Sequence, residues 1–473
     1  MRRLARLLIA LPLMPIMLSE QAAAEAVNLP EPLRTGAAEL RERAATDSDA
    51  YSLVRALALE VGPRLAGSDG DRAAVAWALT TLMERDFEAV RAEDVAVPRW
   101  ERGSTRVELT QPYAVRLAAE TLGGSIGTSE YGIEAPVVGA ANIAELQAMS
   151  TDAVAGKIVY LGQRMTRSRD LSGYLETVGN RVHGAAVAAE LGAVGLVLRS
   201  VATGNHRLAH TGTMRYRPNV RRIPAFALSN PDADLLEYQL AGGQPVSLRL
   251  YSTARALGPA RSANVIGEIR GSRRPEQIVL LGAHLDAWDL GSGAIDNAAG
   301  VAIVIEAARL VATMGRPART LRIVLYANEE FGLSGANDYF ARHRDTLGAH
   351  VVALEADMGA APVWRFDSRV PDSALPLVSA LHEALEPLGI ERGDNAAFGG
   401  ADISVLRDHG VPVLQLTQDM THYFDWHHSA SDTLDKVVPD ELAQAVAAWA
   451  TLIYLLANMD ADLGRLPVPD PAG

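Results

Sequence analysis

The sequence predicts an α/β fold in which a largely parallel central sheet is flanked by helices and split by a β-rich insertion. Residues 35–92 carry an amphipathic helical pattern. From about Trp100 to Thr253, short stretches rich in β-branched residues alternate with turns. From 255 to 460, near-continuous apolar stretches alternate with helical segments, which is typical of buried parallel strands covered on both faces.

The first 24 residues differ from the rest of the chain. Three arginines precede an apolar stretch over 7–18, and three alanines follow it. A basic start, a short apolar stretch and an Ala-x-Ala site predict a secretory signal peptide over 1–24. The alternative is an uncleaved anchor, but the stretch is short for a membrane span and two prolines interrupt it. We therefore expect an exported protein, periplasmic or extracellular, with no stable membrane anchor after cleavage.

The length of the remaining chain and the change in its residue pattern predict two domains. With 473 residues, the chain exceeds the size at which one core usually stops growing, so two domains are expected. The main domain is predicted to combine residues 25–100 with residues 255–473, and the insertion to occupy residues 101–254. Strands of the main domain are expected at 278–281, 321–326, 351–354 and 411–416, with helices at about 71–85 and 297–313.

Within the insertion, strands are expected near 105–109, 157–161, 195–198 and 246–250, and a helix over 182–191. Its histidines show no ligand spacing, and we interpret His183, His206 and His210 as structural or surface residues.

Composition excludes several classes of function. The formal net charge is −13, and removal of a leader that carries a net +2 leaves about −15. Such an acidic chain argues against nucleic acid or an anionic membrane as a partner. The chain contains no cysteine, which excludes a cysteine nucleophile, disulfides and thiolate ligands, and fits an oxidising compartment. Any metal must be bound by nitrogen and oxygen atoms.

Histidine and carboxylate residues follow the predicted strands of the last 200 residues. In open α/β sheets, ligands gather at the carboxyl ends of the strands, so we expect these residues to meet. The segments are HLDAWDLGSGAIDN (284–297), NEE (328–330), EAD (355–357), GGAD (399–402) and HHSASDT (427–433).

The first of these segments offers three candidates. His284 lies just past a strand, and Asp286, two residues on, points to the same side in extended geometry. The second ring N–H of a metal-bound histidine usually donates a hydrogen bond to a carboxylate or carbonyl. Asp286 could accept that hydrogen bond, or it could orient a catalytic glutamate. Asp296 lies at the start of the next helix, where its carboxylate could bridge two cations. The alternative role for Asp296 is a helix N-cap.

The other segments add four candidates. Glu329 and Glu330 are adjacent carboxylates that repel each other unless a positive group is near. One facing a metal and one facing a bound water would meet that need, and a solvated acidic loop is the alternative. Asp357 ends a third strand in the same way, and His428 lies in a polar loop after the fourth. Their recurrence at strand ends favours a two-metal hydrolase site over surface charge.

These segments resemble the cocatalytic zinc exopeptidases of metallopeptidase family 28. The resemblance implies a zinc-exopeptidase core with a mixed, largely parallel central sheet flanked by helices, and a β-rich protease-associated-type insertion. It covers nearly all of the mature chain. The matching segments are GAHLDAWDLGSGAIDN (282–297), ANEEFG (327–332), HHSASDT (427–433), GAVGLVLRSVA (192–202) and AHTGTMRY (209–216).

The resemblance implies two divalent metal ions, with Zn as our choice, although nitrogen and oxygen ligands also accept Mn or Co. His427 is interpreted as a neighbour of a ligand. Seven residues match functional positions of the family: the bridging carboxylate Asp296, the ligands His284 and Asp357 of one metal, the ligands Glu330 and His428 of the other, the general base Glu329 and the orienting acid Asp286.

The expected reaction is hydrolysis of a dipeptide or short peptide by a metal-activated water, and the resemblance also suggests a homodimer. An amidohydrolase acting on acylated amino acids could use the same site. A single-zinc glutaminyl cyclase fits the five-ligand set less well, and a non-catalytic peptide-binding relative does not explain the intact Glu329. We expect residues 398–402 and 422–426 to wall the pocket.

Overall fold

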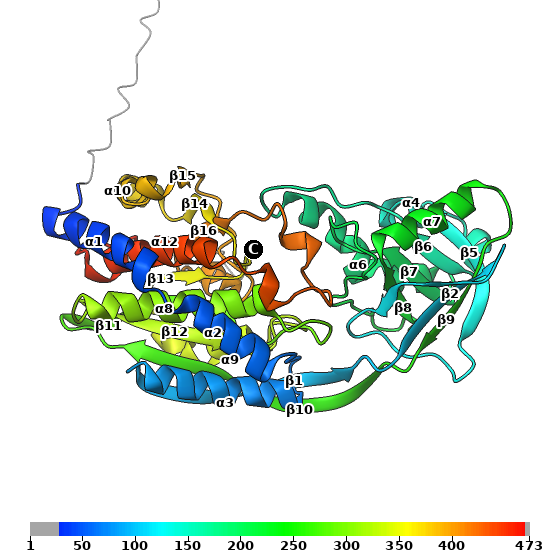
Figure 1. The fold of residues 1–473 in the computed structure, drawn as a ribbon, viewed down its shortest axis with the longest axis horizontal. Helices are drawn as coiled ribbons and strands as arrows, with labels where there is room; N and C mark the ends of the chain where they lie inside the picture. The colour runs from blue at the N-terminus through cyan, green and yellow to red at the C-terminus, as the bar shows by residue number, and fades with distance from the viewer. Residues whose placement is uncertain (1–27, 469–473) are drawn as a thin grey trace, which may run out of the picture.

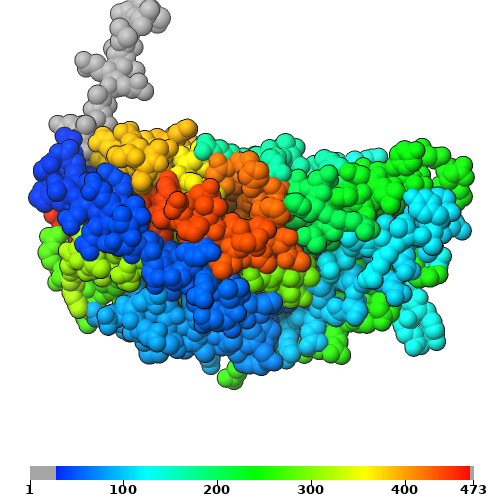
Figure 2. Space-filling model, in the orientation of Figure 1, coloured from blue at the N-terminus to red at the C-terminus, as the bar shows by residue number. Residues whose placement is uncertain are grey.

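The computed structural model describes residues 28–468 and contains two eight-stranded sheets. The predicted signal peptide lies outside the described residues. Figure 1 shows the sheets side by side along the long axis, linked by the ribbon of β1 (Glu88–Glu101) and β10 (Arg255–Ile269). In the space-filling view, the middle of the chain forms one end of the molecule, and the N- and C-terminal segments form the other (Figure 2). Within residues 28–468, no helix is long and apolar enough to cross a membrane.

The first sheet has a parallel centre and antiparallel edges. β12, β11, β13 and β16 run parallel to one another, whereas β10 is antiparallel to β12, and β14 is antiparallel to β16. This confirms the prediction of a mixed, largely parallel sheet. In spatial order the strands are β1, β10, β12 (Arg319–Tyr326), β11 (Arg274–His284), β13 (His350–Glu355), β16 (Val413–Gln418), β14 (Val363–Arg369) and β15 (Glu391–Arg392).

Alternate residues of the central strands pack against helices on opposite faces. Val279 and Leu281 of β11 belong to the core formed with α8 and α12, whereas Ile278 and Leu280 belong to the core formed with α9 and α11. A strand buried on both faces has no polar alternation, which explains the continuous apolar runs. The helices of this domain are α1 (Glu31–Asp47), α2 (Ala50–Ala56), α3 (Asp69–Glu84), α8 (Ala299–Thr313), α9 (Ser334–His343), α10 (Leu375–Glu383), α11 (Ser404–Asp408) and α12 (Pro439–Asn458).

The second sheet takes all its strands from residues 105–252. The chain leaves the first sheet at the end of β1 and returns at the start of β10, where Glu101 pairs with Arg255. The domain boundaries at 101 and 254 stay predictions. In spatial order the strands are β3 (Val115–Leu117), β2 (Thr105–Gln111), β9 (Ser247–Ser252), β5 (Ile133–Ala140), β6 (Ile158–Leu161), β7 (Gly195–Arg199), β8 (Ala225–Leu228) and β4 (Ala119–Thr121).

Helices also accompany the second sheet: α4 (Ile143–Gln147), α5 (Thr151–Val154), α6 (Ser172–Glu190) and α7 (Asn230–Ala241). The helix expected over 182–191 is therefore ten residues longer at its N-terminus. In Figure 1, α6 lies on the side of the second sheet that faces the first sheet. This placement brings an insertion helix next to the carboxyl ends of the parallel strands.

The predicted helical region 35–92 extends too far at its C-terminal end. Residues 88–92 were expected to be helical, but they belong to β1. Only Val95, Val97 and Trp100 of this edge strand are buried. Because most of its other side chains are polar or small and face solvent, β1 lacks the apolar run by which a central strand is recognised.

His350, at the start of β13, gives the fold a predicted sensitivity to acid. The imidazole is fully buried, and its Nε2 lies 2.8 Å from the Tyr339 hydroxyl. Burial, with the positive charge of Arg322, lowers the pKa of His350 to about 3. An unfolded histidine titrates near 6.5, so the neutral form stabilises the fold fully above that pH and progressively less below it.

We expect His350 to account for a loss of about 2 kcal/mol in unfolding free energy between pH 7 and pH 5. Chemical denaturation of His350→Gln at both pH values should show a smaller acid-induced loss by that amount. The matched control is His183→Gln on the exposed face of α6, which should keep the wild-type difference. An unchanged pH dependence in His350→Gln would contradict the assignment.

Candidate metal centre

The carboxyl ends of the parallel strands bring the predicted residues together. His284 is the last residue of β11 and pairs with Tyr326, the last residue of β12. Glu329 and Glu330 follow β12 after a short turn, and Asp357 follows β13, the other neighbour of β11. Three neighbouring strand ends thus supply ligand-type side chains, as the sequence predicts.

Asp296 reaches the same point from the loop after β11. It lies in the turn Ala294–Ala298 that leads into α8, where its own backbone is not helical, and its side chain is 4% exposed. The neighbouring Asn297 provides the cap that was considered for Asp296. Asn297 Oδ1 accepts a hydrogen bond from the Gly300 N–H at 3.1 Å, and its Nδ2 donates to the Ala356 carbonyl at 2.8 Å. The Asp296 carboxylate is therefore directed at the histidines.

Two groups of ligand atoms meet at Asp296. Its Oδ1 lies 3.2 Å from His284 Nε2, which also lies 3.2 Å from Asp357 Oδ1. Its Oδ2 lies 3.3 Å from His428 Nε2, which lies 2.9 Å from Glu330 Oε2. Two ligands of one tetrahedral zinc ion lie about 3.3 Å apart at ordinary bond lengths. Each group therefore has the spacing of atoms that share one ion.

His427 lies closer to this cluster than the sequence indicated. Its Nε2 is 3.5 Å from Asp296 Oδ2, and its ring stacks on His428 with centroids 3.5 Å apart. The ligand atoms of Asp296, His427 and His428 lie within 4.8 Å of one another. Geometry thus offers both Glu330 and His427 as the companion of His428, and the shorter contact favours Glu330.

Glu329 and Glu330 are fixed by different partners. Glu330 Oε2 accepts a 2.6 Å hydrogen bond from the Trp288 indole N–H. Glu329 lines the adjoining cavity, and its backbone N–H donates to Asp286 Oδ1 at 3.0 Å. The preceding residue, Asn328, has φ of 61°, a left-handed conformation that asparagine tolerates better than most residues. This turn allows the two adjacent glutamates to have separate environments.

Asp286 is fully buried behind His284 and Glu329. The Nδ1 of His284 lies 3.0 Å from the backbone carbonyl of Asp286 but 3.7 Å from its carboxylate. A neutral His284 would therefore donate from Nδ1 to that carbonyl and present Nε2 to a metal. The carboxylate instead holds the backbone of Glu329, so the two roles considered for Asp286 divide between its main chain and its side chain.

The cluster buries more negative charge than positive charge. Buried carboxylates without compensation are costly, so this cluster needs cations. Among the described residues, six buried carboxylate oxygens lack a hydrogen-bond partner: Asp286 Oδ2, Asp296 Oδ2, Glu330 Oε1, Glu355 Oε1 and both oxygens of Asp402. Divalent ions with nitrogen and oxygen ligands fit this donor set. Within and around this cluster, the carboxylates that are at most 5% exposed are Asp286, Asp296, Glu330, Glu355, Asp402 and Asp432.

The protonation of the carboxylates differs with their surroundings. Burial raises the pKa of Glu329 well above its usual range, and the charges of Glu330 and Asp357 add to this, against the opposing effect of His284. Burial also acts to raise the pKa of Asp296, but the hydrogen bond from His284 and the close approach of His428 hold that pKa well below its usual range. Carboxylates whose pKa values are driven apart suit different tasks, one carrying a proton and one staying ionised.

Sequence reasoning missed a buried arginine that shapes the loop before Asp296. Arg64 is fully buried and donates to the carbonyls of Leu285, Ser292 and Gly293 at 2.6, 2.7 and 2.9 Å. Gly293 has φ of 61°, and a Cβ there would lie 2.4 Å from the Cβ of Ala287. More than 200 residues separate Arg64 from the loop, so no local pattern could have revealed the contact.

Two further residues support the cluster. Trp288 holds Glu330, as described above, and Asp432 Oδ1 accepts from the Ile295 N–H at 2.8 Å. Both lie inside segments that the sequence singled out. Their hydrogen-bonding partners, however, depend on how the loops meet.

A cavity of about 320 Å³ opens onto the cluster between the first domain and α6. Of the expected walls, Phe398, Gly400 and Ala401 line it, as do Tyr423 and Phe424. The side facing them is built from the insertion and is mainly apolar: Leu171, Tyr174, Leu175, Val178, Arg181 and Val182.

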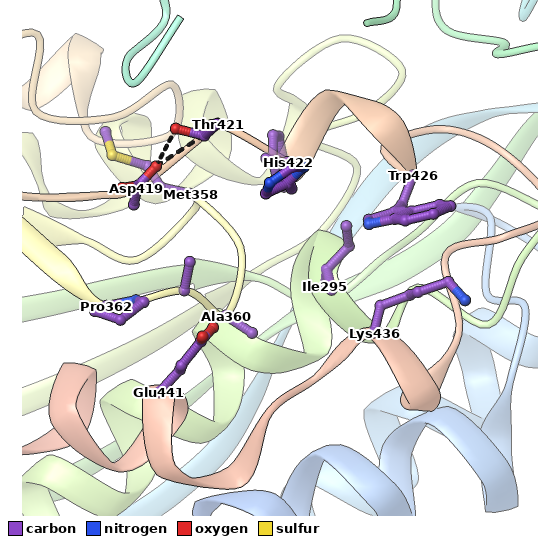
Figure 3. A pocket seen from close by; sticks show the side chains of 12 residues that line it. Ile295, Met358, Ala360, Pro362, Asp419, Thr421, His422, Trp426, Lys436 and Glu441 are labelled. Atoms are coloured by element: carbon purple, nitrogen blue, oxygen red, sulfur yellow. Dashed lines mark hydrogen bonds between the residues drawn. The ribbon is translucent and has the colours of Figure 1, made fainter. Parts of the chain in front are cut away.

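The ends of the predicted wall 422–426 line another cavity. His422 and Trp426 line a hollow of about 400 Å³ with Lys436 and Glu441, shown in Figure 3. The Lys436 ammonium lies 4.7 Å from the centre of the Trp426 ring. Tyr423 and Met358 line both cavities and so form the wall between them. None of the seven predicted site residues lines this second cavity.

Comparison with known proteins identifies the family. The model of Peptidase family M28 matches residues 264–453. Carboxypeptidase Q of Mus musculus is 35% identical over 416 residues, which are 88% of this chain and 87% of the relative. The chain belongs to peptidase family M28. It is a metallopeptidase, and carboxypeptidase Q proteins are its curated relatives.

Solved structures of the M28 family agree with this assignment. The crystal structure of a Peptidase M28 precursor from Shewanella amazonensis SB2B is 43% identical, with a TM-score of 0.90 over 93% of this chain and 99% of that one. A zinc aminopeptidase from Bacillus subtilis is 18% identical, with a TM-score of 0.63 over 89% and 97% of the two chains, and shares the fold. The α/β peptidase fold predicted from the sequence is thereby confirmed.

Proposed function

We propose that this M28 peptidase is an exported dinuclear zinc exopeptidase that hydrolyses dipeptides or short peptides. One observation carries the proposal. The two oxygens of Asp296 face two separate groups of ligand atoms, His284 with Asp357 and His428 with Glu330. A carboxylate between two such groups suits a bridge between two ions.

Zinc is proposed as the metal because imidazole and carboxylate ligands suit it. The Bacillus subtilis neighbour, described as a zinc aminopeptidase, gives further support for this choice. Manganese or cobalt would accept the same ligands.

In the proposed mechanism, His284, Asp296, Glu330, Asp357 and His428 would hold divalent ions, which when bound would lower the pKa of a water molecule and offset the negative charge of the transition state. The Glu329 carboxylate takes the proton from the attacking water and passes it to the leaving amine. Burial raises the pKa of Glu329, which makes its carboxylate a stronger base toward the proton of the attacking water. Asp286 keeps Glu329 in place by accepting a hydrogen bond from its backbone N–H.

The cavity supports a small substrate. Its volume of about 320 Å³ lies at the lower end of the range of small-molecule sites. Residues of the insertion line the side opposite the first domain, which limits the space for a long substrate. Dipeptides or short peptides therefore fit better than folded proteins. Acylated amino acids have similar size and are the alternative substrates.

The predicted signal peptide and the absence of cysteine support export, and a homodimer stays a prediction from the family resemblance. No nucleic-acid partner is proposed for a chain with a formal net charge of −13.

Metal analysis combined with an activity assay tests the proposed function. We expect about two zinc ions per chain in the purified mature protein, because the two ligand groups each suit one ion. Dialysis against a chelator should abolish dipeptide hydrolysis, and added Zn should restore it. One ion with activity would correct the dinuclear assignment. Turnover of acetylated amino acids but of no free dipeptide would favour the amidohydrolase alternative, and no turnover of either would contradict the proposal.

A further inference from the structure

We propose that the second cavity binds a short apolar peptide with free ends, separately from the metal centre. None of the seven predicted site residues lines this cavity, whose volume of about 400 Å³ falls within the range of small-molecule sites. The inference goes beyond the proposed function, because the cavity takes no part in the proposed hydrolysis. Its ligand chemistry follows from an apolar surface and two charged groups.

The inner surface of the second cavity is apolar. Ile295, Met358 and Ala360 line it and are each at most 6% exposed. Pro362 adds to this surface, and the Trp426 ring provides an aromatic side. A ligand with aliphatic or aromatic groups would be stabilised here, because its apolar surface would be removed from water.

Two groups of opposite charge lie on different sides of this apolar surface. Figure 3 shows Glu441 on one side, Lys436 with Trp426 on the other, and Ile295 between them. A short peptide with free ends carries an ammonium at one end and a carboxylate at the other, with its side chains between. Glu441 would therefore bind the ammonium, and Lys436 would bind the carboxylate.

The Glu441 carboxylate is available for a ligand. It lies in the first turn of α12 and forms no ion pair with any residue of the range 28–468. Asp419, the other carboxylate that lines the cavity, is already bound. Its Oδ2 lies 2.7 Å from Arg169 Nε, and its Oδ1 accepts a 2.5 Å hydrogen bond from the Thr421 hydroxyl. The cavity lining thus presents one free carboxylate for an ammonium group.

Lys436 provides the positive charge on the other side. Its ammonium lies 4.7 Å from the centre of the Trp426 ring, and it pairs with Asp435, whose side chain is 66% exposed. An exposed ion pair contributes little stability, so an incoming carboxylate can compete with Asp435. The flexible stem of a lysine allows its ammonium to turn toward that ligand.

The second cavity lies beside the metal centre. Tyr423 and Met358 form the wall between it and the cavity of about 320 Å³ that opens onto the cluster. Ile295 and Met358 are the sequence neighbours of Asp296 and Asp357. A peptide in the second cavity would therefore contact the loops that carry two predicted metal ligands, without occupying the place of the substrate.

The test uses 6-aminohexanoate, which has charged ends, an apolar middle and no peptide bond to hydrolyse. Calorimetric titration of the metal-loaded protein should detect its binding. Hexanoate and hexylamine each lack one of the two charges and should bind about 10-fold more weakly. Equal affinity for the three compounds would overturn the proposal.

Variants of the two charged residues test each end of the ligand. Glu441→Gln should weaken binding of 6-aminohexanoate about 10-fold and leave hexanoate unaffected, whereas Lys436→Gln should leave hexylamine unaffected. The matched control is Asp440→Asn, an exposed carboxylate in the same turn of α12 that does not line the cavity. Equal affinity in Glu441→Gln and Asp440→Asn would contradict the role of Glu441.

Nuclear magnetic resonance locates the ligand. Lys157 and Lys436 are the only lysines of the chain, so reductive methylation with a 13C label, which keeps their charge, gives two lysine signals. 6-Aminohexanoate should shift the signal of Lys436. Lys157, which precedes β6 and does not line the cavity, is the internal reference. A saturating titration that leaves the Lys436 signal unmoved would overturn the site.

Competition tests whether the ligand is a peptide. Leu-Leu should displace 6-aminohexanoate from Glu329→Gln, in which hydrolysis is expected to be slow, and Leu-Leu that is acetylated and amidated at its ends should not. Failure of Leu-Leu to displace the probe would overturn the peptide assignment. None of these measurements needs turnover, so absence of hydrolysis by the wild type would count against the proposed function alone.

Discussion

Glu329→Gln is expected to lower kcat by about 10²- to 10⁴-fold while metal content stays unchanged. The substitution replaces a carboxylate that can carry a proton with an amide of the same shape. In the structure, Glu329 lines the cavity and is held through its backbone by Asp286, so its side chain is not needed to keep the fold. Steady-state kinetics and elemental analysis of the same sample provide the measurement.

The matched control for this variant is Glu60→Gln, an exposed glutamate in the N-terminal region. It should hydrolyse dipeptides like the wild type. Near-wild-type turnover in Glu329→Gln would refute the general-base role. Loss of metal together with turnover would instead make Glu329 a ligand, and the proton-transfer step would need another group.

Asp296→Ala is expected to release metal and to abolish hydrolysis. Both oxygens of this carboxylate face histidines, at 3.2 Å from His284 and 3.3 Å from His428. Removal of a bridging ligand should weaken the binding of both ions. We therefore expect well below one ion per chain, compared with about two in the wild type. Zinc should raise the melting temperature of the wild type but not that of Asp296→Ala, because a ligand stabilises only a protein that binds it.

Elemental analysis and thermal melts with and without zinc measure both effects. Asp152→Asn, an exposed aspartate on α5, is the control and should keep metal and activity. Unchanged metal content in Asp296→Ala would refute the bridging role. Retention of one ion would show that Asp296 serves a single metal, and the other group would then hold its ion through His428 with Glu330 or His427.

The central strands were predictable because burial on both faces leaves a strong local signal. The apolar runs at 278–281, 321–326, 351–354 and 411–416 all lie in or overlap β11, β12, β13 and β16. β1 was missed and β14 was not anticipated, because each lies in the outer part of the sheet, where fewer side chains are buried. A strand with a mixed pattern of burial has no signature that separates it from a surface helix or loop.

The sequence by itself determined the chemistry of the site. Histidine and carboxylate side chains after successive apolar strands can only meet at one edge of a parallel sheet, so their convergence follows from chain order and strand direction. That logic extends to His284, Asp296, Glu330 and Asp357, which were all placed from local spacing or from the family resemblance. The sequence also identified Asp286, because its position two residues after His284 predicts a supporting role beside the metal ligands.

Only the tertiary structure decided what surrounds those residues. Arg64 organises the loop before Asp296 from more than 200 residues away, and Arg181, on a helix that accompanies the other sheet, lines the cavity beside the metal ligands. His427 proved to be as near to Asp296 as a ligand would be. Such contacts depend on how loops and domains pack, and the energy of that packing is spread over many distant residues. The spacing of residues along the chain does not predict these contacts, whereas strand order and the types of ligand residue can be read directly from the sequence.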